Sequence, residues 1–515
     1  MSQFNSKTKT NHRTFEGGKA YARTPKQELF VSAISNFVDT NNFYESQDEM
    51  VTRITELARK VVKSDPEWMY NFVYWLRNKA NLRSVSILIG VEAAVSTTSS
   101  EFTGRKILSG AMARADEPGE VLAYWKNTRG NMKLPAAIKR AVADGARRLY
   151  NQYSVNKYDS SSREFRFGDV INLTHPKPES AEQEQLFKYI LDRRYGNKTL
   201  TGSSLLSLQR NREAFLSLSD EEKIDIIKSD DGHKVLSEAG LTWENILSGV
   251  KGDKEVLWSA LIPTMGYMAL LRNLRNFEEH IKDPEVWRTI YDRISDKSEV
   301  EKSRQLPFRF LSAYKSVSKS HHKLREALER AVAYSLDNIT DLPGNSLIFL
   351  DLSGSMFWSW MSRLSSVTMA EAGSLFAFSL AKKSDKALLV GFGSHNEILD
   401  VPRSFEGILE HTLKMRGMGG TLFSDAIEEH YTPGTYDRVI VITDEQFGSY
   451  HFNDSNPYAT VESNVPVYVW NLVGYRLGSV SGQSNVHQLG GLSSESFNLI
   501  PLIEAGEKGD YPWNV

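Results

Sequence analysis

The chain has 515 residues, more than one hydrophobic core usually supports, so two or more domains are expected. A hydrophobic content of 40% with 24% charged residues is typical of a globular protein and excludes a disordered one. The 62 Lys and Arg nearly balance the 64 Asp and Glu, so the net charge says nothing about a nucleic-acid partner. The chain has no cysteine, which excludes disulfides, thiolate zinc sites, iron–sulfur clusters and cysteine nucleophiles.

Residues 1–24 are polar and mildly basic, and we interpret them as an extended N-terminal arm without the apolar segment of a secretory signal. No apolar run reaches the length of about 18 residues that a membrane span needs. The nearest candidate, residues 261–271, is interrupted by Pro263 and Gly266. We therefore expect a cytoplasmic protein with no membrane partner.

From residue 25 to about residue 340, apolar residues recur at steps of three and four, which predicts helices. Segments that contain Asn, Gly or Pro separate them. Many helices of this length without a fixed repeat favour an all-α domain of helical hairpins. The helices are predicted at 67–77, 121–126, 136–150, 184–195, 243–250, 256–277, 284–294 and 320–336.

Residues 126–163 hold nine Lys or Arg against two Asp, a local excess that the total charge hides. On a helix over 136–150, Arg140 and Arg147 project from the face opposite the apolar one, and Lys139 and Arg148 flank them. Exposed cations with aromatic neighbours are typical of RNA-binding surfaces, and the aromatic residues available here to stack on bases are Tyr150, Tyr153 and Tyr158. A solvated helix face is the alternative interpretation.

Residues 165–178, with the sequence Phe-Arg-Phe-Gly-Asp-Val-Ile-Asn-Leu-Thr-His-Pro-Lys-Pro, resemble a signature of the Ro autoantigen family, whose helical RNA-binding module is called TROVE. Further matches lie at residues 15–21, 270–274 and 306–314, so the resemblance covers nearly the whole chain. It implies a ring of HEAT-like helical hairpins followed by a von Willebrand factor A domain. The RNA-binding residues that it implies are Lys139, Arg140, Arg147, Arg148, Lys157, Tyr158, His175 and Lys177.

The same resemblance implies a function. Members of the family bind small non-coding Y RNA on the outer surface of the ring and single-stranded ends of misfolded RNAs in the central hole. This chain would then act in RNA quality control as a scaffold that recruits polynucleotide phosphorylase or another exoribonuclease. It would be a monomeric protein within a ribonucleoprotein, with no DNA partner, no catalytic residues and no enzymatic activity of its own.

At residues 341–345 the sequence Asp-Leu-Pro-Gly-Asn ends the helical pattern, so we place a boundary there between a helical domain over 25–340 and a second domain over 341–515. Beyond it, strands and helices alternate, which predicts a doubly wound, Rossmann-like α/β domain with its site at the carboxyl ends of parallel strands. The strands are predicted at 346–350, 387–392, 438–443 and 465–472, and the helices at 369–382, 405–415 and 422–430.

Asp351, Ser353 and Ser355 follow the first of these strands, Asp444 follows the third, and Thr421 ends a Gly-Gly-Thr loop between them. Carboxylate and hydroxyl oxygens are hard ligands that suit Mg²⁺, with Mn²⁺ or Ca²⁺ as alternatives. The five residues resemble the metal-ion-dependent adhesion site of von Willebrand factor A domains. In that family the hydroxyls contact the metal, the aspartates bind it directly or through water, and one position stays open for an acidic ligand. An ordinary strand-to-helix turn with a Ser N-cap is the alternative interpretation.

Two other functions fit the sequence. One is a metal-dependent protein-adhesion scaffold in which RNA binding is incidental. The other is a magnesium-dependent RNA hydrolase, which would need a second metal and a general base, and Glu445 is the one carboxylate near the predicted metal site that remains for the base.

Overall fold

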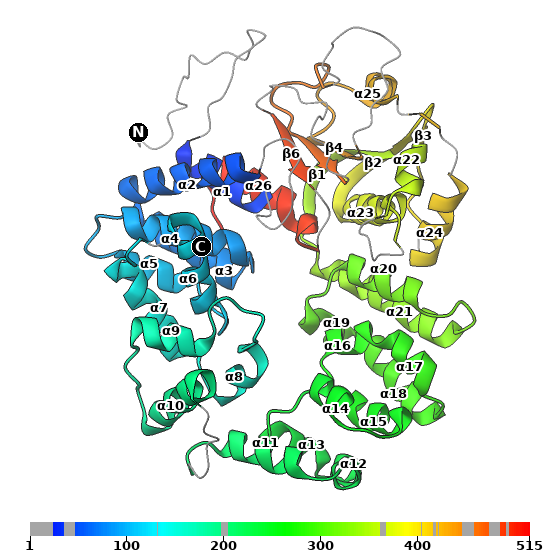
Figure 1. The fold of residues 1–515 in the computed structure, drawn as a ribbon. Coiled ribbons are helices and arrows are strands. Elements are labelled where there is room, and N and C mark those ends of the chain that lie inside the picture. Colours follow the sequence, from blue (N-terminus) through cyan, green and yellow to red (C-terminus); the bar gives the residue numbers. More distant parts are fainter. Residues whose placement is uncertain are drawn as a thin grey trace. The chain divides into compact units, whose positions relative to one another are not determined.

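The computed structural model describes residues 24–35, 47–130, 132–196, 204–360, 367–402, 404–415, 419–420, 422–444, 458–472, 485–490 and 494–514 (Figure 1). Its contacts divide the chain into two compact units. The helical unit comprises Val51–Met265, His280–Lys282 and Pro512–Val515, and the sheet unit comprises Met1–Met50, Gly266–Glu279 and Asp283–Tyr511. The helices between residues 266 and 335 thus belong by their contacts to the sheet unit, and the domain boundaries given by the sequence stay predictions.

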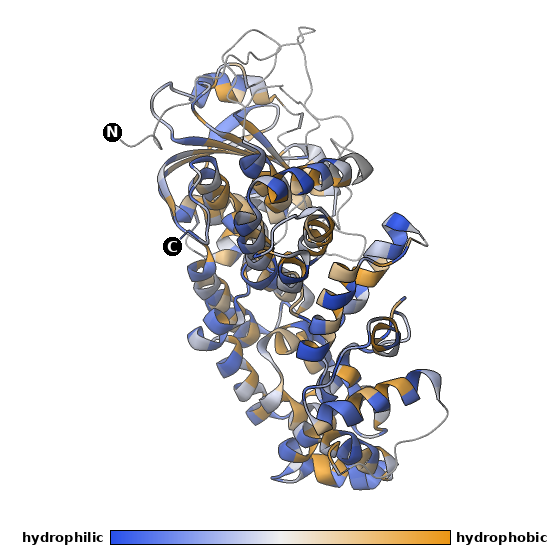
Figure 2. Cartoon of the chain, turned by 90° about the vertical axis from the view of Figure 1, so that its left-hand side faces the viewer, coloured by the Kyte–Doolittle hydropathy of each residue, from blue (hydrophilic) through white to orange (hydrophobic). Residues whose placement is uncertain are grey.

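The helical unit is a succession of helices that pack on their neighbours. α3 contacts α4 and α5, α5 contacts α7, α7 contacts α9, and α9 contacts α10. Hydrophobic and hydrophilic residues alternate along these helices, as in amphipathic helices that share a core (Figure 2). This helix-rich part confirms the predicted all-α architecture. The helices are α2 (Gln47–Ser64), α3 (Pro66–Asn78), α4 (Arg83–Ser96), α5 (Gly104–Gly110), α6 (Glu117–Arg129), α7 (Ala136–Leu149), α8 (Gln152–Tyr158), α9 (Phe167–Thr174), α10 (Ala181–Tyr195), α11 (Ser207–Ser217), α12 (Asp220–Lys228), α13 (Gly232–Glu238), α14 (Trp243–Gly249) and α15 (Lys254–Leu261).

A buried ionic network that periodicity and composition do not reveal holds α3, α4 and α6 together. The Glu117 carboxylate is fully buried and accepts hydrogen bonds from Arg77 Nε at 2.8 and 2.9 Å and from Arg83 Nε at 2.9 Å. Asp116 next to it pairs with Arg114 and with Arg163, which lies outside these helices. The network therefore anchors the segment before α9 to α6.

The single helix predicted over residues 256–277 is wrong. α15 ends at Leu261, a 3₁₀ turn follows at Ile262–Thr264, and then come α16 (Tyr267–Arg272) and α17 (Leu274–His280). Pro263 has no N–H to donate to the helical ladder, which explains the first break. At the second break Asn273 is buried and donates from Nδ2 to the carbonyl oxygen of Ala269 at 2.8 Å, so it closes α16.

The sheet unit combines helices with a mixed α/β sheet. The described strands form a six-stranded sheet in the order β3-β2-β1-β4-β5-β6, parallel except for the antiparallel pair β2–β3. This topology confirms the predicted doubly wound fold. The strands are β1 (Leu342–Asp351), β2 (Ser384–Phe392), β3 (Asn396–Ile398), β4 (Arg438–Thr443), β5 (Val467–Asn471) and β6 (Val486–Gly490). The helices are α1 (Pro25–Ser35), α16, α17, α18 (Pro284–Ile294), α19 (Lys297–Ser303), α20 (Pro307–Ser316), α21 (His322–Ser335), α22 (Gly354–Trp358), α23 (Met369–Lys383), α24 (Phe405–Lys414), α25 (Phe423–His430) and α26 (Leu499–Glu507).

Side chains alternate between the two faces of the sheet, and each face has its own helix. On one face Phe349 contacts Phe423 of α25 at a ring-centroid distance of 5.3 Å. On the other face Phe376 of α23 lies 4.8 Å from the ring of Trp470 in β5. Because β1, β4 and β5 are buried on both sides, their carboxyl ends are held rigidly between two helical layers.

β1 begins earlier than the sequence predicts, inside the segment read as a domain boundary. Leu342 pairs with Ser384 and Asn345 with Lys386, so the register shifts between them. Gly344 absorbs the shift at a φ of 89°, a conformation that suits glycine. Pro343 and Gly344 therefore form a bulge in β1 and do not interrupt it.

Among the described residues, no helix is long and apolar enough to cross a membrane.

Candidate functional sites

The two aspartates of the predicted metal centre meet at one edge of the sheet. Asp351 is the last residue of β1, and Asp444 directly follows β4. β1 and β4 are parallel neighbours in which Leu350 pairs with Ile442, so both strands end at the same level. Both aspartates are fully buried.

The carboxylate of Asp351 is held by hydrogen bonds from Ser353 and Thr443. Oδ1 accepts from the backbone N–H of Ser353 at 2.9 Å, and Oδ2 accepts from Thr443 Oγ1 at 2.6 Å. Burial and the charge of Asp444 nevertheless raise the pKa of Asp351 to about 7. Two buried carboxylates that repel each other are an arrangement that a bound cation would relieve.

The serines lie at the start of α22 without acting as helix caps. Ser353 occupies the N-cap position and is buried, but its hydroxyl makes no capping hydrogen bond. Instead its Oγ lies 3.1 Å from the Oγ of Ser355. The arrangement departs from the ordinary capped turn, because the Ser353 hydroxyl lies against Ser355 and the Asp351 carboxylate and does not cap the helix.

Thr421 lies outside the described residues, but its neighbours are tied to the site. The carbonyl oxygen of Gly419 accepts a hydrogen bond of 2.9 Å from the N–H of Gly354, between the two serines. The N–H of Gly420 donates to Ser394 Oγ at 2.7 Å. The structure thus brings the Gly-Gly segment against the turn that carries Ser353 and Ser355.

The donor set that converges here consists of two carboxylates and two hydroxyls. The described residues contain no group of three or more His, Cys, Asp or Glu side chains that would hold a metal, so a transition-metal site is not formed among them. Hard oxygen donors fit a divalent cation such as Mg²⁺. The two hydroxyls would add ligands to those that the carboxylates provide.

Two tryptophans follow the serines at the surface. Phe357 is buried, whereas Trp358 is 71% exposed and Trp360 is 54% exposed. Large exposed aromatic side chains are enriched where a partner docks.

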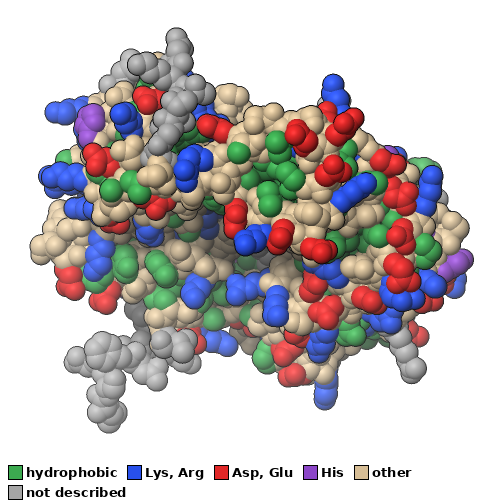
Figure 3. All heavy atoms as spheres, turned by 90° about the horizontal axis from the view of Figure 1, so that it is seen from below, with side chains coloured by type: hydrophobic (Ala, Val, Ile, Leu, Met, Phe, Trp, Pro, Cys, Tyr) green, Lys and Arg blue, Asp and Glu red, His purple; other side chains and the backbone are tan. Residues whose placement is uncertain are grey.

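The second candidate site is the basic surface of α7 and the segments near it. Cationic and acidic side chains are interspersed on the face of the molecule in Figure 3, as the balanced total charge leads one to expect. A binding surface therefore has to be identified from cations that carry no acidic partner. On α7 the apolar residues Ile138, Ala141 and Val142 are buried, which leaves the basic positions outward.

Four of the predicted RNA-binding residues have uncommitted side chains, by which we mean side chains without a hydrogen bond or ion pair to another described residue. Within the described residues, no hydrogen bond or ion pair engages the side chains of Lys139, Arg140, His175 or Lys177. Arg140, His175 and Lys177 are exposed, and Lys139 is half-buried. These three cations and the imidazole are available to contact phosphates.

The segment with His175 and Lys177 is held beside α7. His175 ends α9 in the left-handed conformation, with a φ of 51°. Shortly after it, Glu179 forms an ion pair with Arg147 Nε at 3.0 Å, and Gln183 Nε2 donates to the carbonyl oxygen of Arg147 at 2.7 Å. The structure therefore brings the two parts of the predicted surface together.

The other predicted RNA-binding residues already have partners. Arg147 pairs with Asp144 and Glu179, and Arg148 donates to the carbonyl oxygens of Ser109 and Met112 at the end of α5. Lys157 Nζ lies 5.4 Å from the ring centroids of both Tyr153 and Tyr158. These residues support the surface, and Arg148 in particular links α7 to α5.

One residue that the sequence predicts to stack on RNA bases is buried. Tyr150 is only 3% exposed and stacks on Phe167 with ring centroids 4.0 Å apart and planes 3° apart. The prediction that Tyr150 is available to RNA bases is therefore wrong, because its ring fills the space between α7 and α9. Tyr153 is 41% exposed and remains available.

Comparison with known proteins gives a consistent picture. The family model described as TROVE domain matches residues 225–362. A curated relative named RNA-binding protein RO60, from Deinococcus radiodurans, is 21% identical over 407 residues, which cover 75% of this chain and 73% of the relative. The crystal structure of the Deinococcus radiodurans RO (RSR) protein superposes with a TM-score of 0.73 at 17% identity, covering 95% of this chain and all of that one.

Two relatives are much longer proteins. Telomerase protein component 1 from Mus musculus is 37% identical over 86 residues, and its Rattus norvegicus counterpart is 21% identical over 342 residues. The chain spans only 3% and 13% of their lengths, respectively. The chain thus carries a match to the TROVE domain, is similar to RO60 along most of its sequence and shares the fold of the RO (RSR) protein.

Proposed function

We propose that this chain is a Ro-type RNA-binding protein that binds small structured RNA through the basic surface of α7 and residues 175–177. The observation that carries the proposal is the presence of four uncommitted basic side chains, Lys139, Arg140, His175 and Lys177, on segments that the Arg147–Glu179 ion pair holds together. The name of the RO60 relative supports it.

The chemistry suits recognition of shape more than of sequence. Dispersed Lys and Arg neutralise phosphates and release counterions, so the affinity for RNA falls steeply with salt. An exposed ring such as that of Tyr153 stacks on an unpaired base with little preference among bases. We expect Y-type RNA with a folded stem to be the ligand of this surface, and single-stranded 3′ ends of misfolded RNAs to bind at a second site.

The metal centre would serve recruitment and not catalysis. We propose that Asp351, Ser353, Ser355, Thr421 and Asp444 hold Mg²⁺, or Mn²⁺ or Ca²⁺, and that the bound cation attracts an acidic side chain of a partner protein. The chain's own residues would orient that contact: Thr443 and the N–H of Ser353 hold the Asp351 carboxylate. The exposed Trp358 and Trp360, which follow the serines in the sequence, would offer the partner an aromatic surface. We propose an exoribonuclease such as polynucleotide phosphorylase as that partner, and the protein itself would not be an enzyme.

The experiment that tests this function titrates the full chain with a small stem–loop RNA and, separately, with a single-stranded 3′ tail. We expect both to bind and neither to displace the other, because they occupy different sites. If the two RNAs displace each other, they share a single site, which would contradict the two-site proposal. If neither RNA binds at low salt, the metal-dependent adhesion scaffold is favoured instead.

A further inference from the structure

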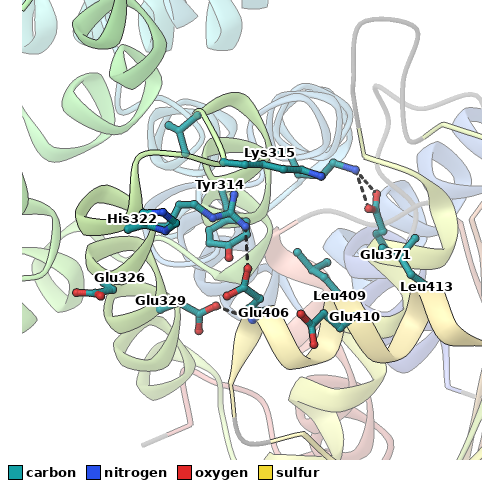
Figure 4. Close-up of a pocket in the computed structure, with 13 residues that line it drawn as sticks. Tyr314, Lys315, His322, Glu326, Glu329, Glu371, Glu406, Leu409, Glu410 and Leu413 are labelled. Atoms are coloured by element: carbon teal, nitrogen blue, oxygen red, sulfur yellow. Dashed lines mark hydrogen bonds and ion pairs between the residues drawn. The ribbon is translucent and has the colours of Figure 1, made fainter.

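The cavity shown in Figure 4 holds ion pairs between helices of the sheet unit. It is lined by residues of α20, α21, α23 and α24. Lys315 Nζ pairs with Glu371 at 2.6 Å, and the Glu406 carboxylate accepts hydrogen bonds from Arg325 and Tyr314. These contacts join the four helices, so the paired charges serve packing and do not indicate a ligand.

An aromatic cluster on the helical unit lies outside both candidate sites. Tyr70 and Tyr74 are one turn apart on α3, and Phe102 precedes α5. The ring of Tyr70 lies 6.4 Å from that of Tyr74 and 5.7 Å from that of Phe102, measured between centroids. The planes are tilted by 32° and 45°, whereas the buried rings of Tyr150 and Phe167 are parallel to within 3°. The rings of the cluster are therefore not stacked face to face on one another.

The cluster lies on the solvent side of α3. Phe72 and Leu76 bury the other side of the helix, whereas Tyr74 is 44% exposed and Tyr70 and Phe102 are half-buried. Within the described residues, no hydrogen bond engages the hydroxyl of Tyr70 or Tyr74. The fold thus anchors α3 through its apolar side and leaves aromatic surface available to a ligand.

A lysine without an acidic partner covers this surface. Lys106 Nζ lies 4.2 Å from the ring centroid of Phe102 and 5.1 Å from that of Tyr70. It forms no ion pair within the described part of the chain, although the exposed Glu101 is only five residues before it. A lysine has a flexible stem and a compact charge, so it can turn from the rings to a phosphate. Aromatic rings beside such a cation are typical of surfaces that bind single-stranded nucleic acid, because the rings stack on bases and the cation contacts the backbone.

α5 connects this cluster to the basic surface of α7, since it contacts both α3 and α7. Asn78 Nδ2 donates to the carbonyl oxygen of Tyr74 at 2.9 Å and to that of the last residue of α5 at 3.1 Å. On α7, Asp144 accepts a hydrogen bond of 2.7 Å from Nη2 of Arg105, the residue before Lys106. Asp144 follows Arg140 by four positions, so the two side chains are neighbours on the helix surface. The aromatic cluster is therefore joined to the helix that carries the uncommitted cations.

We propose that Tyr70, Tyr74 and Phe102 form a stacking platform for unpaired nucleotides of an RNA whose stem lies on the basic surface of α7. One base would stack on the exposed ring of Tyr74, and Lys106 would turn to a phosphate beside it. This platform rests on the proposed function and gives the single-stranded RNA named there a place on the chain. Every base has a face that can stack, so the platform would accept unpaired nucleotides of any sequence.

The test compares two labelled RNAs with the same stem–loop by fluorescence anisotropy on the full chain. One RNA is blunt, and the other carries a short oligouridine tail at each end. We expect the tails to raise the affinity of the wild type at least about tenfold, which is within the range of base–aromatic stacking. Tyr74→Leu keeps an apolar side chain but removes the ring, and it should lower this gain about fivefold.

Three further variants separate stacking from other effects. Tyr74→Phe keeps the ring and should keep the gain. Lys106→Gln should lower the salt slope for the tailed RNA by about 1 and leave that for the blunt RNA unchanged. Trp360→Leu is the control, because it removes an exposed ring of the sheet unit and should bind both RNAs as the wild type does.

The outcomes separate the platform from the proposed function. If the blunt and tailed RNAs bind equally well, or if Tyr74→Leu keeps the full gain, the platform is overturned while the stem-binding surface stands. If neither RNA binds at low salt, both are overturned. If only the tailed RNA binds, and its binding depends on the ring at Tyr74, the platform is supported and the stem-binding surface of α7 is not.

Discussion

The backbone N–H of Gly354 donates a hydrogen bond of 2.9 Å to the carbonyl oxygen of Gly419. Gly354 separates Ser353 from Ser355, and Gly419 begins the Gly-Gly-Thr segment. Two loops far apart in the sequence are thereby joined at the edge of the sheet where Asp351 and Asp444 meet. The Gly354–Gly419 hydrogen bond holds the Gly-Gly-Thr loop beside the turn that follows Asp351. Residues from both segments can therefore contribute to one candidate metal centre.

Replacing Gly419 should therefore disturb metal binding without removing a ligand. Gly419 has a φ of 70°, and an added Cβ would collide with Ser394 Oγ. In Gly419→Ala the left-handed conformation costs about 1–2 kcal/mol and the loop must move. We expect a smaller rise in Tm on adding Mn²⁺ than in the wild type. Gly434→Ala is the matched control, because Gly434 has a φ of 74° but open space around it; an equal loss of the Mn²⁺ effect in both variants would refute the role of the loop.

Removing a ligand charge should have opposite effects with and without metal. In Asp351→Asn the repulsion from Asp444 disappears, so the metal-free protein should unfold at the same Tm or a higher one. Metal at about 100 times its Kd should stabilise the wild type by about 2.7 kcal/mol, and this gain should vanish in the variant. Differential scanning calorimetry with and without Mg²⁺ measures both. Asp400→Ala, an exposed aspartate outside the site, should keep the gain; a gain retained in Asp351→Asn would exclude the site.

The ionic network around Glu117 should make the helical unit sensitive to acid. Burial opposes ionisation of Glu117, but hydrogen bonds from Arg77 and from the N–H groups of Ala113 and Arg114 hold its pKa below the ordinary value. A lowered folded-state pKa contributes stability that is present above the ordinary pKa of about 4.3 and is lost as the pH falls through the folded-state pKa. Urea unfolding across this pH range should show the loss.

The variant Glu117→Gln leaves Arg77 buried with a weakened partner, and it should reduce the free energy of unfolding near pH 7 by about 3 kcal/mol. It should also flatten the acid dependence. If the variant loses stability with falling pH as steeply as the wild type does, Glu117 is not the group responsible.

The C-terminal Trp513 should stabilise the helical unit. Its ring lies 5.3 Å from that of Trp68, 5.5 Å from Phe72 and 5.9 Å from Trp75, all on α3. Trp513→Ala should therefore cost about 2–3 kcal/mol in urea unfolding, somewhat less than a fully buried tryptophan. Trp360→Ala removes an exposed tryptophan of the sheet unit and should leave the stability nearly unchanged. Equal effects of the two substitutions would contradict this packing role.

Most of the sheet unit could be predicted because its strands are apolar on both faces. β4 is Arg438–Thr443, as expected from the run of Val and Ile. β3 has only three residues and two of them are polar, and β6 contains His487 and Gln488, so neither has the composition of a buried strand. Their place in the sheet depends on pairing with β2 and β5, a tertiary effect that periodicity does not reveal.

The candidate RNA surface could be predicted only in outline. The sequence identifies basic residues but not their partners, so it does not distinguish Arg140, which is free, from Arg148, which is bound to two carbonyl oxygens. It likewise does not show that Tyr150 is buried against Phe167. Charge and aromaticity are local properties, whereas availability to a ligand depends on packing between helices.

The central claim is that uncommitted cations beside α7 bind structured RNA. The most direct measurement is fluorescence anisotropy of a labelled stem–loop RNA across a salt series, with the variant Arg140→Ala/His175→Ala/Lys177→Ala. Arg275→Ala/His233→Ala/Lys323→Ala is the matched control, because it removes the same residue types from exposed positions elsewhere. We predict at least about tenfold weaker binding at low salt and a salt slope smaller by about 2 in the first variant, with the control close to wild type. Equal affinity and slope in all three proteins, or no RNA binding by the wild type, would contradict the account.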